Sequence, residues 1–150
     1  MKISNLMSKD LIKLKLDSNT KNEVLSEMVD LLDQAERITS KEDFYQTILE
    51  REEKSTTGVG NGVAIPHGKS SVVKEPTLVF AKSEEGVEFG SFDDKPAKIF
   101  FMIAVPEGKN DDHLKVLAKL SRKLMHADFR EALLSVDTKE ELLKVIEENE

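Results

Sequence analysis

The sequence predicts one α/β domain over residues 1–150, a layered sandwich in which a mixed parallel and antiparallel sheet of about five strands has helices on both faces. A length of 150 residues suits one domain with one core. Residues 99–105 are apolar at every position, which is typical of a central strand covered on both faces. Segments with a helical period come before, between and after the strand-like segments, as expected for helices layered on a sheet.

The first third of the chain predicts a strand and two helices. Partial alternation over residues 11–16 indicates a short strand. Residues 18–20 offer caps for a helix whose apolar stripe consists of Val24, Met28, Leu31 and Leu32. A second helix is expected after Ser40, because acidic residues occupy its first turn, and it should extend to about Arg51. Its end leads into a segment rich in glycine.

The centre of the chain predicts strands separated by turns. The expected turns are Glu85-Gly86 and residues 92–96. The expected strands are residues 63–66, 77–82, 87–89 and 98–105.

The last third predicts three helices. A loop after Pro106 leads to a helix that ends near residue 124 and that Asn110 or Asp111 should cap. Two further helices are expected near residues 128–135 and 138–148, the second opened by a capping-box pattern.

Composition excludes several classes of function. The chain has 22 basic and 29 acidic side chains and a net charge of −7, without a basic run interleaved with aromatics, which disfavours nucleic acid as a partner. The absence of cysteine excludes disulfides, thiolate metal sites and cysteine nucleophiles. No apolar run approaches the roughly 20 residues of a membrane span, and no signal peptide is evident, so we expect a cytoplasmic protein.

Residues 58–68 display one histidine, His67, at the end of a short apolar run framed by glycines. The glycines before the run can take positive φ, and Pro66 fixes φ just before His67. Gly68 adds no side chain beside the imidazole, so the backbone of another molecule could come close. The pattern therefore suits a reactive histidine, although a glycine-rich turn with an exposed histidine would have the same local sequence.

Residues 52–68 resemble the active-site signature of the IIA domains of the bacterial sugar phosphotransferase system, in the fructose/mannitol branch that also includes the nitrogen-regulatory IIA proteins. In that signature an acidic or amide residue precedes an apolar residue and Gly or Ala, and a two-residue gap is followed by apolar-Ala-apolar-Pro-His-Gly. The residues that match are Glu52, Val59, Gly60, Val63, Ala64, Ile65, Pro66, His67 and Gly68. The resemblance extends over nearly the whole chain and implies the same layered α/β fold.

The resemblance implies a phosphotransferase that works through a phosphohistidine. His67 would accept a phosphoryl group from the carrier protein HPr, as tele-phosphohistidine, and pass it to a IIB component that serves a membrane IIC sugar permease. His113 would stabilise or orient the phosphoryl group, and Arg51 would bind its oxygens with a planar fork of donors. Neither a cofactor nor a metal is expected, because phosphoryl transfer needs mainly positioning and electrostatic stabilisation.

Local chemistry leaves other roles open for the supporting residues. His113 could be a solvated residue in a first helical turn, and Arg51 could only complement a helix dipole. Asp111 or Asp112 could orient one ring nitrogen of His113 or simply cap the helix. His126 suits the end of a helix, and we assign it no chemistry.

Two other functions remain open. A nitrogen-type regulatory IIA protein has the same motif but controls partner proteins by its phosphorylation state. A non-catalytic domain could bind an anion at the amides of the glycine loop. A zinc site is disfavoured, because the three histidines lack the close spacing of helix-borne ligands. The sugar is not specified, since a IIA domain does not contact it.

Overall fold

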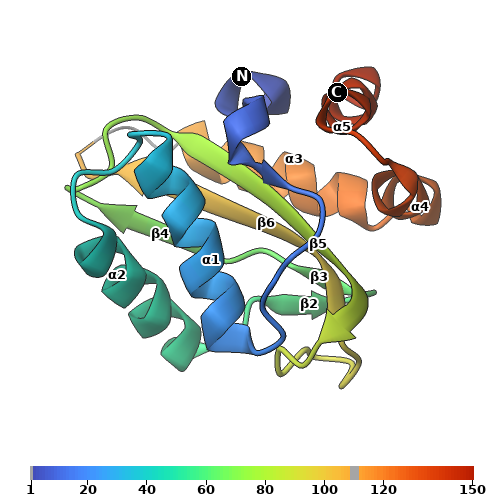
Figure 1. The fold of residues 1–150 in the computed structure, drawn as a ribbon, viewed down its shortest axis with the longest axis horizontal. Helices are drawn as coiled ribbons and strands as arrows, with labels where there is room; N and C mark the ends of the chain where they lie inside the picture. The colour runs from blue at the N-terminus through green and yellow to red at the C-terminus, as the bar shows by residue number, and fades with distance from the viewer. Residues whose placement is uncertain (1, 109–111) are drawn as a thin grey trace.

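A mixed sheet lies between two layers of helices in the computed structural model (Figure 1). The structure describes residues 2–108 and 112–150, and for Asp112 and His113 it describes the backbone alone. The predicted caps Asn110 and Asp111 lie outside the described residues.

The sheet has six strands in the described residues, in the order β1-β5-β6-β3-β2, and β4 also pairs with β6. Its long strands, β5 and β6, are antiparallel, whereas β1 is parallel to β5, and both β3 and β4 are parallel to β6. The short strand β2 is antiparallel to β3. The strand bounds are β1 Ile12–Lys13, β2 Gly58–Gly60, β3 Val63–Ala64, β4 His67–Ser70, β5 Thr77–Val87 and β6 Ala97–Pro106.

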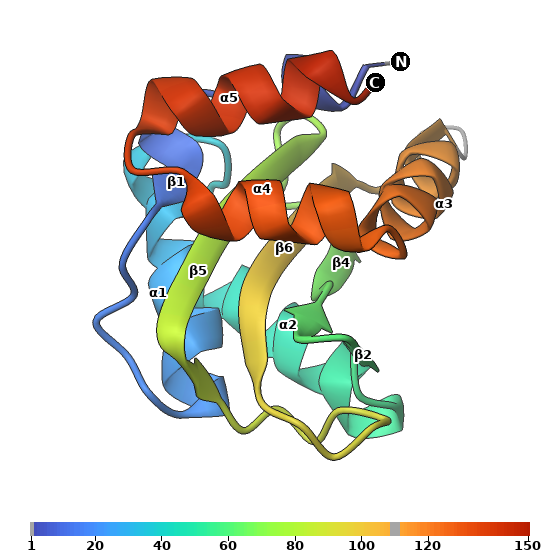
Figure 2. The ribbon, with the colours of Figure 1, turned by 90° about the vertical axis from the view of Figure 1, so that its right-hand side faces the viewer.

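Helices cover both faces of this sheet, as the sequence predicts (Figure 2). The helices α1 (Lys21–Gln34) and α2 (Lys41–Lys54) pack on one face. On the other face lie α3 (Asp112–Leu124), α4 (Ala127–Ser135) and α5 (Lys139–Glu148), together with the short 3₁₀ helix η1 (Ile3–Leu6). A second 3₁₀ helix, η2 (Lys9–Leu11), leads into β1.

Predicted helix caps are present at three helices. The side chains of Thr20, Ser40 and Thr138 accept hydrogen bonds from the third residue of α1, α2 and α5, respectively. These bonds satisfy amide groups that have no partner within the helix, which fixes where each helix begins.

The sheet divides the expected single core into two, one on each face, which explains why β6 is apolar throughout. Alternate residues of a strand point to opposite faces of the sheet. Phe101 and Ile103 belong to the core under α3, α4 and α5, whereas Phe100 and Met102 belong to the core under α1 and α2. The strand is therefore central and covered on both faces, as predicted.

Three predicted strand boundaries are wrong. Of the predicted strand 11–16, only Ile12–Lys13 form a strand, β1; Leu11 ends η2, and residues 14–16 lie outside regular secondary structure. The predicted turn at Glu85-Gly86 lies inside β5, where the register with β6 shifts and Gly86 adopts a φ of 88°; residues 88–89 lie beyond the strand. A bulge thus takes the place of the turn, because glycine permits this backbone conformation without ending the strand.

The predicted strand 63–66 is divided. Its first half is β3, and the chain resumes pairing with β6 as β4 at His67. Pro66 has no N–H to donate to the ladder, but its carbonyl accepts a hydrogen bond from the Ile103 N–H at 2.9 Å. The chain therefore stays beside β6 through the interruption, and the histidine opens a new strand.

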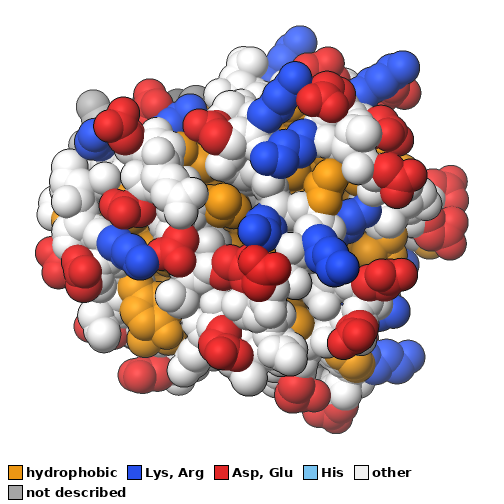
Figure 3. Space-filling view, in the orientation of Figure 1, with side chains coloured by type: hydrophobic (Ala, Val, Ile, Leu, Met, Phe, Trp, Pro, Cys, Tyr) orange, Lys and Arg blue, Asp and Glu red, His pale blue; other side chains and the backbone are white. Residues whose placement is uncertain are grey.

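The surface carries charges of both signs. Acidic and basic side chains are interspersed over the face shown in Figure 3. Among the described residues, no helix is both long enough and apolar enough to cross a membrane.

Candidate functional site

His67 is held by its neighbours in one orientation. It is half-buried at the start of β4, where it pairs with Ile103 of β6. Its Nδ1 lies 2.9 Å from the carbonyl oxygen of Ile65. A carbonyl can only accept a hydrogen bond, so Nδ1 carries the proton of the neutral ring and Nε2 carries a lone pair. The atom available as a nucleophile is therefore Nε2.

Arg51 faces that lone pair. Its Nε donates to Nε2 of His67 at 3.3 Å, and its Nη1 donates to the Ser55 carbonyl at 2.9 Å. The helix α2 extends to Lys54 rather than to about Arg51, so Arg51 lies in the last helical turn and its side chain reaches the adjacent loop. The predicted proximity of Arg51 and His67 is present. These two contacts leave further N–H groups of the guanidinium for an anion.

Glu52, the residue after Arg51, is buried and contacts a different set of groups. Its carboxylate accepts hydrogen bonds from the N–H and the hydroxyl of Thr57, and pairs with the ammonium of Lys21 at 2.8 Å. The Lys21 ammonium also donates to the Phe89 carbonyl and lies over the ring of Phe89. No pattern in the sequence singles out Lys21 or Thr57, because their contacts join segments that are separated in the chain.

The glycine loop has the backbone conformations that its sequence predicts at two of three positions. Gly60 and Gly62 have φ values of 98° and 76°, and Asn61 between them has 58°. Gly58 is favoured for another reason, since a Cβ there would overlap the Ser91 hydroxyl and lie 3.0 Å from the Ser91 Cα. The tip of the loop is fixed by Asp93, whose carboxylate accepts from the Asn61 N–H at 3.0 Å.

Asp93 joins this tip to the loop between β5 and β6. Hydrogen bonds from the backbone N–H groups of Lys95 and Asn61 hold the pKa of Asp93 below its usual range, because they stabilise the carboxylate form. The glycine loop is therefore anchored by a charged acceptor.

Gly68 does not leave an open approach to the imidazole. It is buried, and a Cβ there would lie 3.2 Å from both Ile48 and Thr47 of α2. The glycine allows α2 to pack closely on β4, which brings Arg51 to His67. The expectation that its missing side chain admits another molecule is wrong.

The backbone of His113 lies in the first turn of α3, and its side chain is outside the described part of the chain. The pairing of His67 with Ile103 puts both residues on the sheet face that α3 covers, since Ile103 shares a core with Val116 and Leu120 of α3. The backbone arrangement thus agrees with a shared location for His67 and His113, and their contact stays a prediction.

The prediction that Asp111 or Asp112 orients a ring nitrogen of His113 stays a prediction, because Asp111 and the side chain of Asp112 lie outside the described part of the chain. His126 is the residue before α4 and makes no side-chain capping bond to it. Within residues 2–108 and 114–150, no group of three or more possible ligands is arranged to hold a metal ion.

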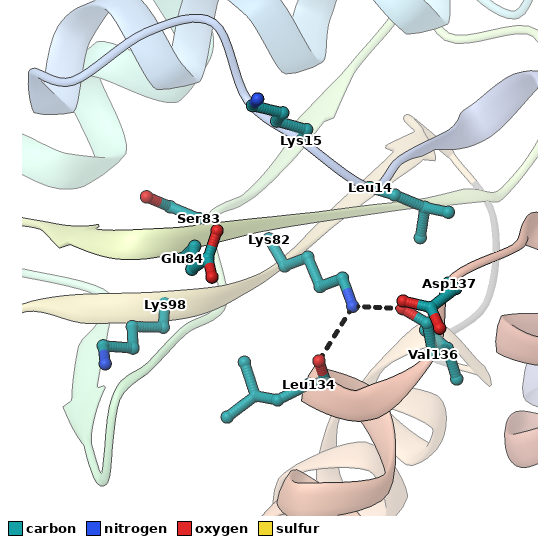
Figure 4. A pocket seen from close by; sticks show the side chains of 9 residues that line it. All are labelled: Leu14, Lys15, Lys82, Ser83, Glu84, Lys98, Leu134, Val136 and Asp137. Carbon is teal, nitrogen blue, oxygen red and sulfur yellow. Dashed lines mark hydrogen bonds between the residues drawn. The ribbon is translucent and has the colours of Figure 1, made fainter.

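A cavity of about 440 Å³ lies elsewhere, beside β5 and the segment that joins α4 to α5 (Figure 4). The Lys82 ammonium points to that segment and donates to the carbonyls of Leu133, Leu134 and Val136. None of Arg51, Glu52 and His67 is among the residues that line the cavity. The ammonium of Lys82 therefore contacts carbonyls at and just after the end of α4.

Comparison with known proteins identifies the family of this chain. Residues 5–149 match the family described as "Phosphoenolpyruvate-dependent sugar phosphotransferase system, EIIA 2". The chain is 43% identical over 146 residues to the fructose-specific EIIA component of Haloferax volcanii, which covers 97% of this chain and 95% of that protein. It is 39% identical over all 150 residues to the fructose-specific EIIABC component of Bacillus subtilis, but spans only 24% of that longer protein.

Solved structures show the same fold. The nitrogen regulatory protein IIA-Ntr from Neisseria meningitidis superposes with a TM-score of 0.90 at 34% identity, covering 96% of this chain and 98% of that one. The Escherichia coli complex of enzyme IIAMTL with phosphorylated enzyme IIBMTL contains a chain with a TM-score of 0.81 at 25% identity, covering 95% of this chain and 97% of that one. The family match over nearly the whole length, supported by these relatives, shows that this chain belongs to the EIIA 2 family of the phosphoenolpyruvate-dependent sugar phosphotransferase system.

Proposed function

We propose that this chain is a phosphocarrier that receives a phosphoryl group on Nε2 of His67 from HPr and passes it to a IIB component. The observation that carries the proposal is the pair of contacts on the imidazole. Nδ1–H is held by the Ile65 carbonyl, and the Nε2 lone pair faces the guanidinium of Arg51. The ring is thus in the tautomer that a nucleophile at Nε2 requires.

In the proposed step the Nε2 lone pair attacks the phosphorus of the phosphohistidine on HPr. A new N–P bond forms at His67, the old N–P bond breaks, and its electron pair returns to the histidine of HPr. The Nδ1 proton stays at the Ile65 carbonyl, so the transfer needs no general base. In the next step a IIB cysteine thiolate would attack the same phosphorus, an S–P bond would form, and the N–P bond at His67 would break with its electron pair returning to Nε2.

Arg51 would change partners as the phosphoryl group arrives. A guanidinium that now donates to Nε2 would donate to the phosphoryl oxygens instead, while its second contact to Ser55 keeps it in place. The negative charge that spreads over those oxygens in the transition state would be stabilised by a cation that is already positioned. In the same proposal His113 supplies a second donor from the first turn of α3.

The partners are proposed from the relatives. The solved Escherichia coli complex pairs a similar IIA with phosphorylated IIB, which supports a IIB component as acceptor. The fructose-specific relatives support sugar uptake as the output. A cytoplasmic location and delivery of the sugar through a membrane IIC permease belong to the same proposal.

Regulation is the second candidate output. The superposition on a nitrogen regulatory protein, with a TM-score of 0.90, favours it, as does 35% identity over 137 residues to the nitrogen regulatory protein of Bradyrhizobium diazoefficiens. The phosphoryl chemistry at His67 would be the same. A purified IIB component of the fructose type would remove the phosphoryl group from the chain if the output is transport, and would leave the chain phosphorylated if the output is regulation.

The function is tested by intact-mass spectrometry after incubation with phosphoenolpyruvate, enzyme I and HPr. We expect one acid-labile phosphoryl group on the wild type and on His126→Ala, and none on His67→Ala. An unmodified wild type, with the same enzyme I and HPr active on another IIA protein, would overturn the proposal and favour the anion-binding alternative.

A further inference from the structure

We infer that Glu52 is a positioning residue for phosphoryl transfer, because it fixes residues 55–57, which hold Arg51 directly and His67 through Ile65. This inference rests on the proposed function of His67 and adds a residue that does not touch the imidazole. It also gives a physical reason for an acidic residue at this point of the chain.

Glu52 is a buried charge with all of its partners in place. Its side chain is 5% exposed and its Oε2 lies 2.8 Å from the Lys21 ammonium. Oε2 also accepts from the Thr57 N–H at 3.2 Å, and Oε1 accepts from the Thr57 hydroxyl. A buried carboxylate is tolerated when it is paired and hydrogen-bonded in this way. The carboxylate therefore ties the end of α2 to Thr57 and to the start of α1.

Thr57 carries this restraint to the imidazole. Its carbonyl accepts from the Ile65 N–H at 3.0 Å, and the Ile65 carbonyl accepts from Nδ1 of His67 at 2.9 Å. The peptide groups of Thr57 and Ile65 thus form a continuous chain from the Glu52 carboxylate to the ring. A displacement of Thr57 would move the carbonyl that selects the Nδ1–H tautomer.

The same loop also holds Arg51. Its Nη1 donates to the carbonyl of Ser55, two residues before Thr57. Residues 55–57 therefore present one carbonyl to the guanidinium and another to Ile65, two residues before His67. Fixing this loop at Thr57 therefore positions both the Nε2 lone pair of His67 and the Arg51 guanidinium that faces it.

The contacts of Glu52 favour a carboxylate over an amide, because one of its partners is a cation. Both groups of Thr57 that reach Glu52 are donors, and so is the Lys21 ammonium. A glutamine could accept from the Thr57 N–H with its oxygen and donate to the Thr57 hydroxyl with its amide, but neither bond would then be to a charged group. Glu52→Gln keeps the shape of the side chain but removes the negative charge that strengthens the hydrogen bonds from Thr57, and it leaves the Lys21 ammonium without its counter-ion.

The test compares Glu52→Gln with Glu53→Gln, since Glu53 is the exposed acid beside it. The first readout is the tautomer of His67 in the unphosphorylated protein, taken from two-bond ¹H–¹⁵N correlations at a pH where the ring is neutral. We expect the wild type and Glu53→Gln to show one tautomer with the proton on Nδ1, and Glu52→Gln to show a mixture. The Ile65 amide should exchange with solvent faster in Glu52→Gln alone.

The second readout is the rate of phosphorylation by phospho-HPr. We expect it to fall about ten- to hundredfold in Glu52→Gln, the effect of a reacting group misplaced by a fraction of an ångström to an ångström. Glu53→Gln should react at the wild-type rate. A folded Glu52→Gln with the wild-type tautomer, Ile65 exchange and rate would overturn the inference.

Two further outcomes are possible: Glu52→Gln does not fold, or the wild-type chain is not phosphorylated. If Glu52→Gln fails to fold, Thr57→Val removes only the hydroxyl donor and should give the same changes at smaller size; wild-type behaviour of this variant would then refute the inference. If the wild-type chain is not phosphorylated at all, the proposed function fails, while the tautomer and exchange measurements still decide whether Glu52 orients the ring.

Discussion

The Nε atom of Arg51 lies 3.3 Å from Nε2 of His67, on the side of the ring opposite the hydrogen bond of Nδ1 to the Ile65 carbonyl. The ring is held at both nitrogens, by an acceptor at one and a cationic donor at the other. This arrangement distinguishes the two nitrogens chemically, since only Nε2 has a free electron pair.

Replacing Arg51 by lysine tests whether the guanidinium fork matters or only its charge. Lysine keeps a positive charge but cannot contact Nε2 and Ser55 together in the same geometry. We expect phosphorylation by limiting phospho-HPr to slow by about 10- to 100-fold, as for the loss of a charge-assisted hydrogen bond. Arg37→Lys, at an arginine that contacts Glu75 and Thr77 instead, should react at the wild-type rate. Equal rates for the two variants would refute a special role for Arg51.

Gly68→Ala tests the close packing of α2 on β4. The added methyl would press on Ile48 and Thr47 at 3.2 Å, so α2 or its side chains must move. We expect the free energy of unfolding in urea to fall by about 1–3 kcal/mol, as for other overpacked sites. Phosphorylation should slow as well, because Arg51 moves with α2. Lys69→Ala, at the exposed neighbour in β4, should change neither property. Wild-type stability of Gly68→Ala would contradict this account of the glycine.

We predict that the contact between Asp93 and the glycine loop depends on pH. Its pKa is lowered by hydrogen bonds from Lys95 and Asn61, so its stabilising contribution is complete above the unfolded pKa of about 4 and is lost as the pH falls through the lower folded value. We expect the amide signals of Asn61 and Lys95 to shift together in that acidic window in ¹H–¹⁵N spectra. Asp93→Ala should remove the shift, and Asp94→Asn should retain it. Titration of the two amides at different pH values would contradict a shared anchor.

Lys82→Met tests whether the cavity beside β5 belongs to the function. The substitution keeps an apolar stem but removes the donor to three carbonyls at the end of α4. We expect a loss of about 1 kcal/mol in the free energy of unfolding. Burial lowers the pKa of Lys82, so the wild type should gain stability as the pH rises toward the pKa of an unfolded lysine, and the variant should lack this gain. The rate of phosphorylation should be unchanged; a large decrease would connect the cavity with phosphoryl transfer.

Local patterns predicted most of the fold. The continuous apolar run at residues 99–105 and the capping residues Thr20, Ser40 and Thr138 are signals within one segment, and each produced the expected element. The errors arose where an element depends on a partner strand. Gly86 could have been a turn or a bulge, and only pairing with β6 makes it a bulge. Pro66 divides a strand that remains beside β6 through a carbonyl.

The proximity of Arg51 and His67 was predictable, but the network around them was not. The spacing around Pro66 and His67 predicted a displayed histidine, and Arg51 came from the resemblance to a family. The roles of Thr57 and Lys21 depend on contacts that cross from α1 to α2 and to the loop before β2. The role of Gly68 was predicted wrongly, because a missing side chain can serve a neighbouring helix as well as an incoming molecule.

The most direct test of the central claim is a long-range ¹H–¹⁵N spectrum of the ¹⁵N-labelled protein after phosphorylation by phospho-HPr. We predict that the signals of one histidine, assigned to His67 by their loss in His67→Ala, will change to the pattern of a ring phosphorylated at Nε2 and protonated at Nδ1. A phosphoryl group on Nδ1, or on any residue other than His67, would contradict the account of how Ile65 and Arg51 prepare this ring.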